Sequence, residues 1–147
     1  MKFRTSIFPI LQLLVVIYLY SWTFFTENIS MEIGVSWFIL LCFLISSYGL
    51  YKNKEWGKYS SIFLHWLVIS NAFIFLRNIP YYINYNLMDK SIIYNEIIGI
   101  VLPLVLSVFL IRKSNYKKAA FFIILSIIIS LVMHQTINIF TEGKIYL

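Results

Sequence analysis

The sequence predicts an all-α membrane protein: a single domain over residues 1–147, built as a bundle of five transmembrane helices. Of its 147 residues, 61% are hydrophobic and 12% are charged, whereas a soluble domain is about half apolar and about a quarter charged. The apolar residues fall into five long runs, and the cations gather in alternate connections between these runs. A water-soluble fold of this size would need far more polar surface, so the lipid bilayer is the expected solvent.

Each apolar run has about the length that a helix needs to cross the hydrocarbon core, roughly 20 residues. The predicted spans are residues 7–25, 33–51, 59–79, 92–111 and 119–140. The first run is not read as a cleaved signal peptide, because the bulky residues Trp22, Phe24 and Phe25 occupy the place of small cleavage-site residues. The short connections predict that consecutive helices are antiparallel neighbours in one bundle.

Cations are divided unequally between the two sides of the predicted bundle. The N-terminus and the even-numbered connections hold nine of the 12 Lys and Arg residues: Lys2, Arg4, Lys52, Lys54, Lys58, Arg112, Lys113, Lys117 and Lys118. The other side holds Arg77, Lys90 and Lys144. Because short cytoplasmic loops carry the excess of Lys and Arg, we expect the N-terminus in the cytoplasm and the C-terminus outside. The two basic stretches, 52–58 and 112–118, are read as loops that anchor the protein at an anionic leaflet.

Polar side chains inside three of the predicted spans form stripes at helical spacing. The stripe on 119–140 consists of Ser126, Ser130, His134 and Asn138, with Gln135 beside it. Run 59–79 carries Ser70, Asn71, Arg77 and Asn78 within one arc, and run 92–111 places Glu96, Gly99, Pro103 and Ser107 on one face. A rise of about 1.5 Å per residue brings several of these residues to the same outer depth. The sequence therefore predicts a polar pocket open to the external side, lined by Asn71, Arg77, Glu96, His134, Gln135 and Asn138.

The same stripes have a structural explanation, in which Ser, Asn and His side chains hydrogen-bond neighbouring helices. For the stripe on 119–140 we favour this packing role over ligand binding, and His65 is also read as a packing residue. Arg77 can equally reach the headgroups, and Glu96 can lie at the interface. His65 and His134 differ in depth by roughly 13 Å, which argues against a shared haem or metal ion. We therefore expect neither a metal nor a cofactor.

Three classes of function remain open, and the first is favoured. It is a non-catalytic module that binds another membrane protein, as an accessory subunit or an immunity-type protein would. The second is a transporter or channel component that uses the outer pocket, and the third is an enzyme in which Glu96 and His134 form an acid–base pair. The net charge of +6 sits beside the apolar runs, which argues against nucleic acid as a partner. Self-association into a homo-oligomer stays open.

The composition, with 26 Ile and 9 Asn but only 5 Gly, is typical of an AT-rich bacterial genome. In size and composition, though through no shared motif, the chain is similar to small accessory membrane proteins of such bacteria, including immunity proteins against pore-forming toxins. This resemblance implies a multi-pass protein of the cell membrane.

Overall fold

The computed structural model contains five α-helices and describes residues 3–20, 31–77 and 90–142. The helices are α1 (Phe3–Tyr20), α2 (Met31–Tyr51), α3 (Glu55–Arg77), α5 (Lys90–Arg112) and α6 (Tyr116–Glu142). The predicted all-α bundle is confirmed over these residues, and each predicted span coincides with one helix. The predicted ends at 21–25 and 78–79 lie outside the described residues.

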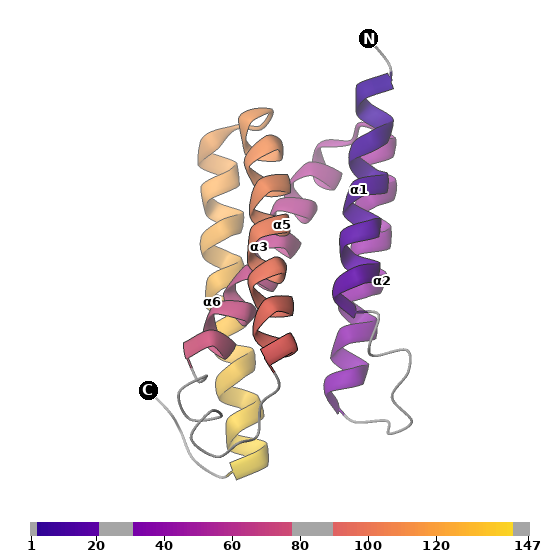
Figure 1. Cartoon of the computed structure of the whole chain (residues 1–147). Coiled ribbons are helices and arrows are strands. Elements are labelled where there is room, and N and C mark those ends of the chain that lie inside the picture. The colour runs from indigo at the N-terminus through magenta and orange to yellow at the C-terminus, as the bar shows by residue number, and fades with distance from the viewer. Residues whose placement is uncertain (1–2, 21–30, 78–89, 143–147) are drawn as a thin grey trace.

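Helix α3 lies at the centre of the bundle (Figure 1). It packs against α2, α5 and α6, whereas α1 packs mainly against α2. The expectation that consecutive helices are neighbours holds for α1 with α2, for α2 with α3 and for α3 with α5. Helices α5 and α6 make few contacts with each other, because both pack on α3. Position in this bundle is therefore decided by packing on the central helix more than by the length of the connections.

The connection between α2 and α3 is a tight turn of three residues, 52–54, and is shorter than the seven-residue loop predicted from the basic stretch. The amide of Lys54 donates to the carbonyl of Gly49, and the amide of Asn53 donates to that of Leu50, both at 2.9 Å. Asn53 has a φ of 54°. This is the Schellman helix end, in which asparagine tolerates the left-handed position that usually requires glycine. The turn lets α3 begin within the basic stretch.

The backbones of α2 and α3 touch just beyond this turn. A Cβ added to Gly57 would fall on the carbonyl carbon of Gly49 and lie 2.5 Å from the amide nitrogen of Leu50. A Cβ added to Gly49 would lie 2.6 Å from the ring of Trp56 and 2.8 Å from the Cα of Gly57. Such distances are below van der Waals contact, so the crossing requires glycine on both helices. Small residues allow membrane helices to approach in the same way.

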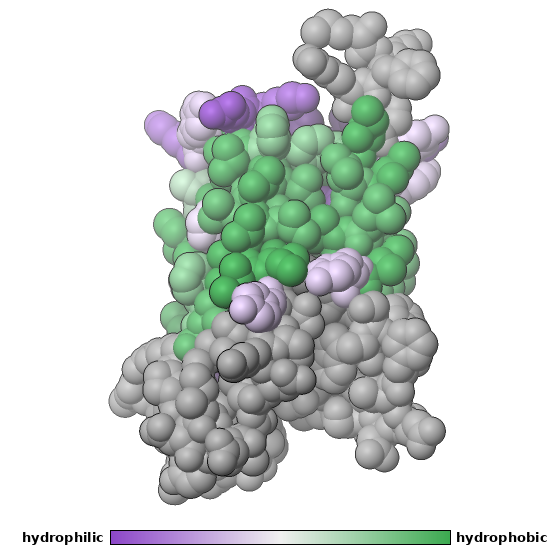
Figure 2. All heavy atoms as spheres, in the orientation of Figure 1, coloured by the Kyte–Doolittle hydropathy of each residue, from purple (hydrophilic) through white to green (hydrophobic). Residues whose placement is uncertain are grey.

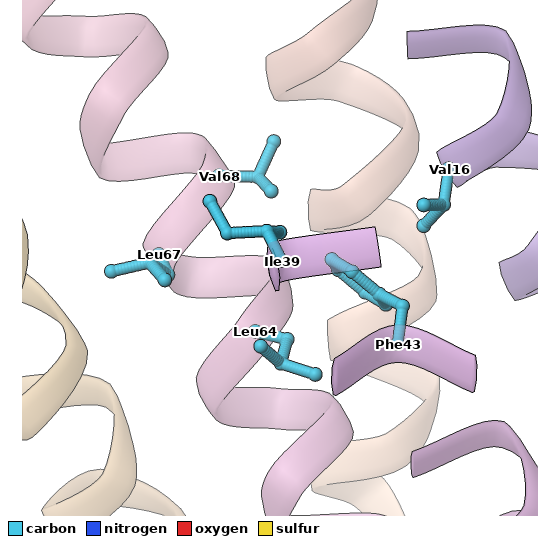
Figure 3. Close-up of a cluster of buried hydrophobic side chains, with 6 residues drawn as sticks. All are labelled: Val16, Ile39, Phe43, Leu64, Leu67 and Val68. Carbon is cyan, nitrogen blue, oxygen red and sulfur yellow. The ribbon is translucent and has the colours of Figure 1, made fainter. Parts of the chain in front are cut away.

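Two clusters of buried apolar side chains join the helices. The first, shown in Figure 3, unites α1, α2 and α3 through Val16, Ile39, Phe43, Leu64, Leu67 and Val68. The second unites α2, α3, α5 and α6 through Leu50, Tyr59, Ile62, Leu110 and Ala119. Because α3 contributes to both clusters, it ties the α1–α2 pair to α5 and α6.

The outer surface of the helices is as apolar as the core. Large hydrophobic side chains are exposed on each of the five helices, and Figure 2 shows them as a broad apolar band, with hydrophilic residues gathered at the end that holds the α5–α6 turn. The buried side chains, by contrast, include several polar ones: Gln12, Ser46, Ser47, Ser61, His65, Ser107, Ser126 and Ser130. Within the described residues, one helix, over Tyr116–Thr136, is long and apolar enough to cross a membrane. Shorter apolar stretches are Ile7–Tyr18, Trp37–Tyr51 and Ile97–Arg112.

Candidate functional site

A fully buried glutamine joins α1 to α2. Gln12 lies on the face of α1 that also carries Val16, one turn further along, and this face packs against α2. Its Nε2 atom donates to the hydroxyl oxygens of Ser46 and Ser47, each at 2.8 Å, and lies 3.4 Å from the carbonyl of Phe43. The Oε1 atom of Gln12 has no hydrogen-bond partner within the part of the chain that the structure describes. Sequence reasoning missed this residue. The one signal for it was a lone amide within an apolar run.

His65 is buried in α3 and acts as a packing residue, as predicted. Its Nδ1 atom lies 2.7 Å from the carbonyl oxygen of Ser61, so Nδ1 must donate, since a carbonyl oxygen only accepts. Its ring packs edge-on against that of Phe43, with 5.4 Å between centroids. Nε2 is left buried with no hydrogen-bond partner. The histidine therefore ties α3 to α2 and is held in one orientation.

The predicted outer pocket is described in part. The hydroxyl of Ser130 on α6 donates to Oδ1 of Asn71 on α3, at 2.7 Å. His134 and Gln135 follow about one turn further along α6 and are half-buried. The stripes of α3 and α6 meet at this bond between their side chains, and the pocket itself stays a prediction. Three of the six pocket residues lie in the helices but have side chains outside the described part of the structure: Arg77, Glu96 and Asn138. The predicted contact of these three side chains with the rest of the pocket stays a prediction.

The described residues of the predicted polar stripes on α5 and α6 are buried or half-buried. On α5, the predicted face contributes the buried residues Gly99, Pro103 and Ser107. The hydroxyl of Ser107 donates to the carbonyl of Leu104 at 2.9 Å, and that of Ser126 donates to Ile123 at 2.7 Å. Small hydroxyl side chains that bond within their own helix need no external partner, which favours the packing explanation of these stripes.

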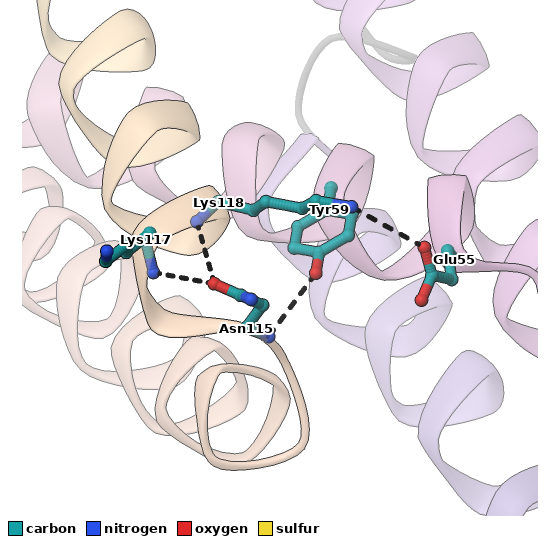
Figure 4. Close-up of polar contacts among 5 residues, drawn as sticks. All are labelled: Glu55, Tyr59, Asn115, Lys117 and Lys118. Carbon is teal, nitrogen blue, oxygen red and sulfur yellow. Dashed lines mark hydrogen bonds and ion pairs between the residues drawn. The ribbon is translucent and has the colours of Figure 1, made fainter.

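Polar contacts join the beginnings of α3 and α6 at the basic end (Figure 4). The backbone amide of Asn115 donates to the hydroxyl of Tyr59 at 3.3 Å. The Oδ1 atom of Asn115 caps α6 by accepting from the amides of Lys117 and Lys118, at 3.0 and 3.4 Å. Lys118 Nζ lies 4.0 Å from an oxygen of Glu55, but both side chains are well exposed, so this ion pair adds little stability. The two basic turns therefore lie side by side.

Comparison with protein-family models, with curated proteins and with solved structures finds no match to this chain. Among the described residues, no group of three or more His, Cys, Asp or Glu side chains is placed to hold a metal ion. Over the described residues, the chain is a bundle of five helices with apolar side chains on its outer surface and several polar side chains buried inside.

Proposed function

We propose that the chain is a multi-pass protein of the cell membrane whose five helices span the bilayer. The distribution of side chains supports this proposal. Soluble monomers rarely expose a contiguous apolar patch larger than a few hundred Å², yet α1, α2, α5 and α6 each expose large hydrophobic residues along their length, and α3 does so at Trp56 and Phe73. Buried amide, imidazole and hydroxyl groups lie among the apolar side chains of the interior, and such groups are typical of helix contacts in lipid.

The basic turns support the proposed orientation, with the N-terminus in the cytoplasm and the C-terminus outside. The bond between Tyr59 and Asn115 holds the α2–α3 and α5–α6 turns together at one end. Seven of the nine cations assigned to the cytoplasmic side belong to these turns and the adjoining helix ends. Cations concentrated at one end of a membrane bundle are retained on the cytoplasmic side.

Within the membrane, we propose a non-catalytic role, the binding of another membrane protein through the outer face of α6. This helix packs with one side on α3 and exposes the opposite side. At spacings of three, four and three residues, Phe121, Ile124, Ile128 and Leu131 form a continuous seam, each about half exposed or more. The alternation of three and four is the spacing by which two helices interlock at a crossing angle of about 20°. Exposed apolar residues at the same spacing also occur on α1 and α2, and we favour α6 because it is the described helix that is long and apolar enough to cross a membrane.

The described polar side chains are consistent with a binding role. Gln12, His65 and Asn71 are each engaged in contacts that hold the bundle together. Groups fixed in this way are less suited to moving a substrate or transferring a proton than groups that line an open path. A transporter or an enzyme remains the alternative if a bound small molecule is found in place of a protein.

The test is purification from native membranes in mild detergent, followed by native mass spectrometry. Ile128→Trp places a bulky ring in the seam, and Ile45→Trp on α2 is the matched control, since the two residues are 52% and 54% exposed. We expect a protein partner in fixed stoichiometry with the unaltered chain and with Ile45→Trp, and its loss from Ile128→Trp at unchanged thermal stability. A partner that stays with Ile128→Trp, or a second copy of the chain as the only companion, contradicts the proposal.

A further inference from the structure

A small recess lies at the basic end, between the beginning of α1, the α2–α3 turn and the end of α5. We propose that it binds the phosphate group of an anionic phospholipid of the cytoplasmic leaflet. The proposal rests on the membrane placement and orientation proposed above. The recess measures about 60 Å³, room for roughly four water molecules at about 15 Å³ each, which suits one phosphate group with its oxygens.

The walls of the recess are apolar. Phe8 of α1 and Phe109 of α5 meet edge to face across it, with ring centroids 5.9 Å apart. Leu50 and Leu110, both buried, form the rest of the apolar lining. A fully hydrated soluble anion gains nothing from such walls. The glycerol and the first methylenes of a lipid chain would cover them, and would continue onto the exposed apolar surface of the helices.

Three polar side chains line the rest of the recess, and all three can donate hydrogen bonds. Lys58 comes from the first turn of α3 and is half-buried, and Lys113 directly follows α5. Asn53 adds an amide, and its left-handed backbone is fixed by the Schellman turn. Among the described residues that line the recess, none is acidic. Two lysines and an asparagine therefore line one recess from the α2–α3 turn, the first turn of α3 and the residue after α5, and their side chains are a donor set for a phosphate.

The two lysines of the recess differ from the other lysines that make this end of the molecule positively charged. Lys54 and Lys117 are also exposed at the same end, but they do not line the recess. All four lysines attract an anionic surface, yet Lys58 and Lys113 alone of these four border an apolar cavity. Basic pockets between membrane helices on the cytoplasmic side are known to hold anionic headgroups.

The experiment measures lipid binding to the detergent-purified full chain by native mass spectrometry, with phosphatidylglycerol and phosphatidylcholine of equal chain length. The test variant is Lys58→Gln with Lys113→Gln, and the matched control is Lys54→Gln with Lys117→Gln, which removes the same charge from the same end. Two cations at about 1 kcal/mol each correspond to about a thirtyfold weaker binding of phosphatidylglycerol in the test variant. The control should change by no more than about threefold, because exposed charges outside the site are screened.

A third variant, Asn53→Gly, keeps the left-handed turn, since glycine adopts it freely, and removes the amide. We expect it to weaken phosphatidylglycerol binding by about tenfold, the loss of one hydrogen bond to a charged group. Equal losses in the two lysine variants, equal affinity for phosphatidylcholine, or displacement of the lipid by millimolar inorganic phosphate would each overturn the proposal. Partner capture through α6 is read in the same spectra, so failure of the lipid site is distinguishable from failure of the proposed function.

Discussion

Gly57→Ala tests the closest contact in the bundle, the crossing of α2 and α3. The added methyl group would meet backbone atoms of Gly49 and Leu50, which cannot rotate away as a side chain can. The two helices must therefore separate, and the turn that joins them must deform. Gly49→Ala is the informative comparison, because its methyl group would first meet the ring of Trp56, a side chain that is half exposed and can swing outward, and then the Cα of Gly57 at 2.8 Å.

The change in the free energy of unfolding expected for Gly57→Ala is the difference of two opposing effects. Overpacking a closely packed site costs about 1–3 kcal/mol, and the backbone contact places Gly57→Ala at about 3. Alanine regains about 1 kcal/mol over glycine through its higher helix propensity. The net loss in free energy of unfolding is then about 2 kcal/mol, which for a chain of this size corresponds to a Tm lower by about 6 °C. Gly49→Ala should lose about half as much, because the ring of Trp56 can yield.

The assay is thermal unfolding in mild detergent, followed by far-UV circular dichroism because removal of Trp56 alters fluorescence. Trp56→Ala is combined with each glycine variant in a double-mutant cycle. We expect Trp56→Ala to relieve part of the loss in Gly49→Ala and none of the loss in Gly57→Ala. A Gly57→Ala protein as stable as the unaltered chain, or equal relief of both variants, would refute the direct backbone crossing.

Two further experiments test the polar contacts between helices. Gln12→Leu removes the hydrogen bonds to Ser46 and Ser47 at similar side-chain volume. At about 0.6 kcal/mol per hydrogen bond, the free energy of unfolding should fall by about 1 kcal/mol, which corresponds to a Tm lower by about 3 °C. An unchanged or higher Tm would mean that the glutamine does not tie α1 to α2. The pair Asn71→Ala and Ser130→Ala should show a coupling free energy of about 0.6 kcal/mol in a double-mutant cycle, whereas strictly additive losses would mean that α3 and α6 are not joined there.

The long apolar runs located the five described helices well. They placed the beginnings of α1, α3 and α6 three to four residues too late, since charged residues at the edge of an apolar run can belong to the first turn of a helix. The turns depend on two asparagines within the basic stretches. Asn53 takes a left-handed conformation and Asn115 caps α6, and both roles are known preferences of asparagine.

Sequence reasoning singled out the polar residues that repeat along one helix. It missed polar residues that stand alone in an apolar run. The repeat on α6 led to Ser130 and so to its bond with Asn71. Gln12 was overlooked because a single amide in an apolar run has no period of its own. The glycine crossing was missed as well, since Gly49 and Gly57 lie on opposite sides of a turn whose geometry decides whether they meet.

Accessibility of single cysteines in intact cells tests the membrane placement most directly. The natural Cys42 is replaced by serine, and cysteine is introduced in turn at Lys54, Asn86 and Asn115. With a membrane-impermeant thiol reagent, we expect labelling at position 86 from outside, and labelling at positions 54 and 115 only after the cells are permeabilised. Labelling at 54 or 115 in intact cells, or protection of position 86, would contradict the five-span arrangement with its basic end in the cytoplasm.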